Sequence, residues 1–169
     1  MKTLSTFSAI ACLLASTSQA DVLVRFIEGA PKDRFVISAD TNACAGVAKT
    51  VTIDLVTSSG GLIFDVTGQG SGVEVFQPFE LTSGADKVTK ASKLRDGDQV
   101  LTLELSQVSK DMPVSFTTDL DDTQAGRQIT VSGSEITGAM VNVTQNGKMY
   151  VGTFESDARA RVATQACAS

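Results

Sequence analysis

The strongest constraint on the fold of this chain is its β-branched side chains, which alternate with polar residues along short segments. In residues 21–169, Val, Ile and Thr supply 18, 6 and 16 residues, whereas Leu supplies only 9. Branching at Cβ stiffens a side chain and suits it to the pleated surface of a sheet. In segments 50–55 and 101–105 the apolar residues occupy every second position, so one face of each meets a core and the other meets water. The sequence therefore predicts an all-β protein.

The spacing of these segments favours an antiparallel β-sandwich, Ig-like or jelly-roll-like, with about eight to ten strands. The strands are predicted at residues 22–27, 34–38, 50–55, 62–67, 73–79, 101–105, 114–116, 129–132, 139–144 and 149–154. Asn146 and Gly147 predict a tight hairpin, because both residues tolerate a positive φ. Residues 155–166 have a helix-friendly composition and are equally compatible with a last strand at 161–164.

The first twenty residues have the pattern of a secretory signal peptide. Lys2 supplies a positive charge, residues 7–15 are an apolar run, and small residues lead to Ala20. This order predicts cleavage after Ala20, and the run is too short for a transmembrane helix. A lipoprotein signal acylated at Cys12 is the alternative, but Cys12 lies in the middle of the run and Ala9 replaces the usual large aliphatic residue. Residues 21–169 are then predicted to form one exported domain, in the periplasm, at the cell surface or outside the cell.

Cleavage would leave two cysteines, Cys44 and Cys167, separated by 123 positions. In an oxidising compartment a single pair of cysteines predicts one disulfide. In the loop-entropy model such a bridge stabilises the fold by about 4–5 kcal/mol. The alternative is a pair of free or intermolecular thiols.

Several function classes conflict with the composition. The chain contains no His, which excludes Ser-His-Asp and Cys-His catalysis and imidazole metal ligands. A net charge of -5 and a pI near 4.7 argue against nucleic acid as a partner. No run of eighteen apolar residues is present, so no membrane span is predicted. The GxGxxG spacing of a dinucleotide loop is absent from the glycines at 68, 70 and 72. Their pattern instead predicts a flexible inter-strand loop.

The acidic residues are the most suggestive chemistry, with 13 Asp and 6 Glu in residues 21–169. If the strand that begins at Val114 continues, Asp119 and Asp121 share its outer face, roughly 6–7 Å apart. Calcium selects several such oxygen ligands on loops. The candidate calcium ligands are Asp96, Asp98, Asp119, Asp121 and Asp122, although the EF-hand pattern is absent. The alternative is that these residues form turns and keep the surface soluble.

Catalysis by carboxylates alone has little support. Glycoside hydrolysis uses paired carboxylates and usually an aromatic-lined cleft, but the chain has no Trp and only one Tyr. The string Asp65-Val66-Thr67-Gly68 does not match the DTG or DSG motif of aspartic proteases. A hydrolase would require a cleft with two converging carboxyl groups. We therefore predict that the protein is not an enzyme.

Several strings along residues 21–140 resemble a known family. They are residues 24–35 (VRFIEGAPKDRF), 64–67 (FDVT), 72–78 (GVEVFQP), 96–98 (DGD), 116–123 (FTTDLDDT) and 130–136 (TVSGSEI). Together they resemble small secreted bacterial proteins named after the sponge aggregation factor core protein. The resemblance implies adhesion or matrix binding, with calcium at the Asp residues named above, and it brings no catalytic residues.

These observations predict an exported, non-enzymatic adhesion or aggregation module, calcium-assisted, with a protein or an extracellular matrix or glycan as its partner. The alternative is a small periplasmic carrier or scaffold that binds an apolar ligand or a partner strand. Exposed edge strands such as residues 73–79 motivate that alternative.

Overall fold

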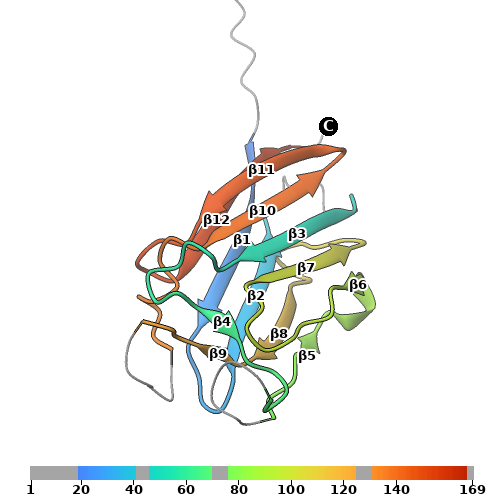
Figure 1. The fold of residues 1–169 in the computed structure, drawn as a ribbon. Coiled ribbons are helices and arrows are strands. Elements are labelled where there is room, and N and C mark those ends of the chain that lie inside the picture. Colours follow the sequence, from blue (N-terminus) through green and yellow to red (C-terminus); the bar gives the residue numbers. More distant parts are fainter. Residues whose placement is uncertain (1–18, 41–45, 70–75, 125–130, 167–169) are drawn as a thin grey trace, which may run out of the picture.

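The computed structural model describes residues 19–40, 46–69, 76–124 and 131–166. These residues form an all-β fold of two five-stranded antiparallel sheets that pack together as a β-sandwich, which confirms the predicted class. A separate two-stranded pair lies at one end of the sandwich (Figure 1). Cys44, Cys167 and residues 1–18 lie outside the described residues, so the disulfide and the signal peptide at 1–20 stay predictions. The last two residues of that predicted peptide, Gln19 and Ala20, belong to the first strand of the fold.

Sheet A contains five strands in the order β12 (Arg159–Gln165), β1 (Gln19–Ile27), β2 (Asp33–Ala39), β8 (Val114–Thr118) and β5 (Glu80–Ser83). Sheet B has the order β11 (Lys148–Thr153), β10 (Met140–Gln145), β3 (Lys49–Asp54), β7 (Val100–Leu105) and β6 (Val88–Ala91). The short pair consists of β4 (Ile63–Phe64) and β9 (Leu120–Asp121). A 3-10 turn, η1 (Ala85–Lys87), joins β5 of sheet A to β6 of sheet B.

One hydrophobic core fills the space between the two sheets. Strands such as β2, β3 and β12 bury every second side chain, as their sequence alternation predicts. The ring of Phe35 stacks on Phe116 with centroids 5.1 Å apart, and Phe26 lies at 5.3 Å. Phe154 meets Phe35 edge-on at 6.3 Å. These four rings form the aromatic centre of the core.

Most of the long predicted strands occur where the alternation placed them. The segments at 50–55, 101–105, 139–144 and 149–154 correspond to β3, β7, β10 and β11. Asn146 and Gly147, with φ of 52° and 74°, close the β10–β11 hairpin. Residues 155–166 contain β12, so the strand alternative holds rather than the helix.

Three predicted strands differ from the structure. The strand predicted at 62–67 is reduced to the two residues of β4, since the chain bends away after Phe64. Of the strand predicted at 73–79, residues 73–75 lie outside the described residues and residues 76–79 form no strand. The strand β5 begins only at Glu80, beyond Pro78, which cannot donate a hydrogen bond to a neighbouring strand. Residues 131–132 form no strand either, while 129–130 lie outside the described residues.

Gly152 on β11 packs against the backbone of β12. A Cβ atom at Gly152 would lie 2.5 Å from the carbonyl oxygen of Arg161. Because backbone cannot rotate aside, Gly152→Ala is expected to cost about 1–3 kcal/mol of unfolding free energy. Urea unfolding measures this, with Gly46→Ala as the control because nothing lies within 4 Å of its Cβ position. An unchanged midpoint for Gly152→Ala would contradict the tight β11–β12 contact.

Candidate functional site

The candidate site is an acidic cluster of three residues, Asp65, Asp119 and Asp121, held together by the short β4–β9 pair. In this pair Phe64 faces Leu120 and Ile63 faces Asp121. The same register sets Asp65 opposite Asp119, whose carbonyl oxygen accepts a hydrogen bond of 3.2 Å from the Asp65 N–H. Asp121 lies two residues beyond Asp119, so both side chains lie on the same side of the strand.

The acidic cluster is compact and largely shielded from water. One carboxylate oxygen from each residue lies within 4.8 Å of the other two. Asp65 is 1% exposed and Asp121 is 8% exposed, while Asp119 is half-buried. Asp119 and Asp121 therefore share a side as predicted, but that side is not solvent, because the chain leaves sheet A at Asp119 and β9 pairs with β4.

A fourth carboxylate, Asp33, lies beside the acidic cluster at the start of β2. Asp33 pairs in register with Thr118, the residue before Asp119. Its side chain is 2% exposed, and its Oδ1 accepts a hydrogen bond of 3.1 Å from the N–H of Gly29. Burial raises the pKa of Asp33 to about 8, the Gly29 hydrogen bond opposes the shift, and the charge of Asp119 reinforces it.

Burial and neighbouring negative charges both act on Asp119 in the acidic cluster. Burial, and then the charges of Asp121 and Asp65, raise the pKa of Asp119 to about 7, against a weaker opposing effect of Lys32. A cation held near Asp119 would relieve this repulsion.

Asp96 and Asp98, which the sequence also proposed as calcium ligands, stabilise a turn. The Oδ1 of Asp96 accepts hydrogen bonds of 2.8 Å from the N–H groups of Val66 and Thr67, and the Thr67 hydroxyl bonds to its Oδ2. Desolvation raises the pKa of Asp96, but the hydrogen bonds outweigh it and bring the pKa below its ordinary value. The Oδ2 of Asp98 accepts a 2.8 Å hydrogen bond from the N–H of Arg95. These contacts match the turn-forming alternative.

The structure thus groups two of the five proposed ligands and adds one that sequence reasoning missed. Among the described residues, Asp65, Asp119 and Asp121 are the carboxylates close enough to hold one ion, and Asp96, Asp98 and Asp122 lie outside this group. Asp65 stands inside the apolar run 62–66. A charged residue in such a run is rarely buried without a role or a partner, and this signal points to Asp65.

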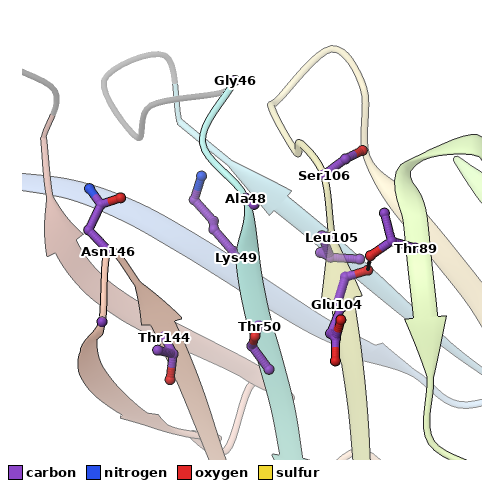
Figure 2. A pocket seen from close by; sticks show the side chains of 11 residues that line it. Gly46, Ala48, Lys49, Thr50, Thr89, Glu104, Leu105, Ser106, Thr144 and Asn146 are labelled. Atoms are coloured by element: carbon purple, nitrogen blue, oxygen red, sulfur yellow. Dashed lines mark hydrogen bonds between the residues drawn. The ribbon is translucent and has the colours of Figure 1, made fainter.

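A second feature is a hollow of about 440 Å³ at the start of β3, which includes Lys49, Thr50, Glu104, Thr144 and Asn146 in its lining (Figure 2). Lys49 is 2% exposed, and its Nζ donates a 3.0 Å hydrogen bond to the carbonyl oxygen of Val47. Burial lowers the pKa of this amine. The lining of the hollow combines these charged and hydroxyl side chains with apolar residues such as Ala48 and Leu105.

Comparison with protein-family models, with curated proteins and with solved structures found no significant match to this chain. Within the described residues, no helix has the length and apolar character needed to cross a membrane. Function must therefore be argued from the chemistry of the sites themselves.

Proposed function

We propose that this chain is an exported, non-enzymatic adhesion or aggregation module whose acidic cluster binds calcium. The observation that carries the metal part is the juxtaposition of Asp65, Asp119 and Asp121, with oxygens within 4.8 Å of one another. Two oxygens bound to one calcium ion at 2.3–2.6 Å lie at most about 5 Å apart. The spacing therefore fits a single ion that all three carboxylates contact.

The donor set favours calcium over transition metals. All three side chains offer oxygen, and the chain has no His to supply an imidazole ligand. Hard cations such as calcium select carboxylate and carbonyl oxygens, whereas zinc and copper sites rely on nitrogen and sulfur. A divalent cation would also remove the mutual repulsion that raises the pKa of Asp119.

The adhesion part rests on the architecture and on the family resemblance. The acidic cluster lies at one end of the β-sandwich. An ion bound there would order the nearby loops, and the partner would contact those loops. The strings shared with proteins named after the sponge aggregation factor core protein favour a protein or matrix partner outside the cell. The carrier alternative would use the hollow near Lys49, whose lining mixes polar and apolar residues.

Calorimetric titration of the purified protein with calcium tests the metal part. We expect saturable binding at one site and a melting temperature raised by several degrees at about 100 times Kd, because a ligand at that concentration adds about 2.7 kcal/mol. Asp119→Asn and Asp121→Asn are expected to weaken binding at least tenfold. Asp111→Asn is the matched control, since Asp111 is exposed and lies outside the cluster. Absence of heat and of a thermal shift would overturn the calcium proposal.

The adhesion part needs its own experiment. Beads coated with the protein are expected to cluster, or to bind cells of the organism that makes it, when calcium is present. They are expected to disperse when a chelator is added. Beads coated with Asp119→Asn should cluster weakly, while the Asp111→Asn control should match the unmodified protein. Calcium binding without any calcium-dependent clustering would contradict the adhesion role and leave the metal site intact.

A further inference from the structure

The outer face of sheet A carries most of the arginines of an otherwise acidic protein. The chain has a net charge of -5 and six Arg residues. Four of them, Arg25, Arg34, Arg159 and Arg161, stand at exposed positions of β1, β2 and β12. Their neighbours in sequence are buried core residues such as Val24, Phe35 and Ala160, so the four arginines point away from the core on one face. We call this set the arginine face.

Sheet order brings these four residues together. Arg25 on β1 lies directly opposite Arg159 on β12, and Leu23 lies opposite Arg161. Arg34 on β2 is the partner of Ile27, two positions along β1 from Arg25. Same-face neighbours along a strand are about 6.6–7 Å apart, and directly paired residues are closer. The guanidinium groups therefore span three adjacent strands on one face of sheet A.

The positive charge of the arginine face is only partly neutralised within the protein. Arg161 contacts Asp21 at 3.2 Å, and Arg159 lies 3.8 Å from Asp157. Among the described residues Arg25 and Arg34 form no ion pair, and both are exposed. Lys32 and Glu80 pair with each other at 2.7 Å, and Asp40, just after β2, accepts a hydrogen bond of 3.1 Å from the N–H of Asp21. Like charges placed directly opposite each other destabilise a sheet. An anion bound between Arg25 and Arg159 would relieve their repulsion.

We propose that the arginine face binds an anionic polysaccharide, a polymer that carries sulfate or carboxylate groups along an extended chain. The planar guanidinium fork pairs with both groups through two parallel hydrogen bonds. A small free anion is held in a concave site, whereas charges spread over three adjacent strands match a polymer that places anions at successive positions. This proposal rests on the proposed extracellular role and adds the chemical class of the partner. It does not depend on calcium.

The residues between the arginines argue against nucleic acid as the polymer. Leu23, Val36 and Ile27 fill the spaces between the arginines on this face. None of them is aromatic, so single-stranded bases have no ring on which to stack.

Binding to dextran sulfate and to alginate, with neutral dextran as the blank, tests the proposal in the presence of a chelator and about 0.1 M salt. We expect binding of both charged polymers and a loss of at least tenfold in affinity for Arg25→Gln/Arg34→Gln. The matched control is Lys93→Gln/Arg95→Gln, which changes the net charge equally at exposed positions outside sheet A. The control is expected to change affinity by less than about twofold.

Three results would overturn the proposal. They are no binding of either charged polymer, equal losses for the two double variants, and tighter binding of a single-stranded oligonucleotide than of both polysaccharides. Because the chelator removes calcium, failure here is distinguishable from failure of the calcium proposal. Unchanged melting temperatures of the variants establish that any loss of binding is not a loss of folding.

Discussion

The melting temperature of the calcium-free protein is expected to fall as the pH rises from about 5 to about 9. Burial raises the pKa of Asp33 to about 8 and that of Asp119 to about 7. An unfolded chain releases these protons near pH 4, so between about pH 4 and 8 the folded state holds protons that the unfolded state lacks. The stabilisation is complete below about pH 4 and is lost as the pH rises through 7 and 8.

The size of this effect follows from the two shifts. A shift of one pKa unit corresponds to about 1.4 kcal/mol, and Asp119 counts for less because it is only half-buried. A combined loss of a few kcal/mol corresponds to a melting temperature lower by roughly 5–15 °C in a domain of this size. Besides Asp65 and Asp121, the charged neighbours are Glu28, which acts on Asp33, and Lys32, which acts on Asp119.

Two variants separate this mechanism from general surface charge effects. Asp33→Asn keeps a carbonyl oxygen that can accept the Gly29 hydrogen bond and removes the titrating group. Its stability curve is expected to flatten between about pH 5 and 9, whereas the exposed control Asp111→Asn retains the slope. A flat curve for the unmodified protein, or a curve that rises with pH over this window, would show that the carboxyl groups are ionised in the folded state.

Calcium and protons should compete for the acidic cluster if the proposed function is right. The ion requires ionised carboxylates, so calcium is expected to raise the melting temperature more at pH 8 than at pH 5.5. Added calcium would then remove part of the fall in stability at high pH. Proton-linked stability without any effect of calcium would contradict the calcium proposal.

Phe35→Ala is expected to lower the free energy of unfolding by about 3–5 kcal/mol, the range seen when a buried Phe is truncated. Phe35 is 0% exposed and lies at the centre of the aromatic group, stacked on Phe116 at an interplanar angle of 17°. Its ring also contacts Phe26 and Phe154. Truncation therefore removes three ring contacts and leaves a cavity where the two sheets meet.

Urea unfolding of Phe35→Ala and Phe76→Ala measures the difference directly. Phe76 is 71% exposed, so its truncation is expected to change stability by less than about 0.5 kcal/mol. Phe35→Leu should lose less than Phe35→Ala because it keeps part of the buried volume. Equal midpoints for Phe35→Ala and Phe76→Ala would mean that the packing around Phe35 contributes little.

The strands that sequence reasoning found are those whose pattern is local. Alternation in residues 50–55 and 101–105 is visible within six residues, and it leads to β3 and β7 in the middle of sheet B. The segments that it missed, such as β5, β6 and β9, are two to four residues long. Such short elements are stabilised by pairing with a distant strand, which a local pattern does not reveal.

The acidic cluster could likewise be predicted from local sequence only in part. The spacing of Asp119 and Asp121 is local, and their common side followed from the period of a strand. Asp65 is 54 positions away from Asp119 in the sequence and reaches it only through the β4–β9 register. The spacing of residues in the sequence therefore could not predict that Asp119 groups with Asp65 rather than with Asp96.

The sequence by itself determined that this protein is all-β, lacks imidazole chemistry and concentrates its reactive groups in Asp side chains. These properties follow from the identity and alternation of neighbouring residues. Only the tertiary structure decided which Asp residues meet, that they meet in a shielded site, and that β12 lies beside β1 to assemble the arginine face. Those outcomes depend on pairing between strands far apart in the chain, where contact is set by sheet order and register rather than by sequence distance.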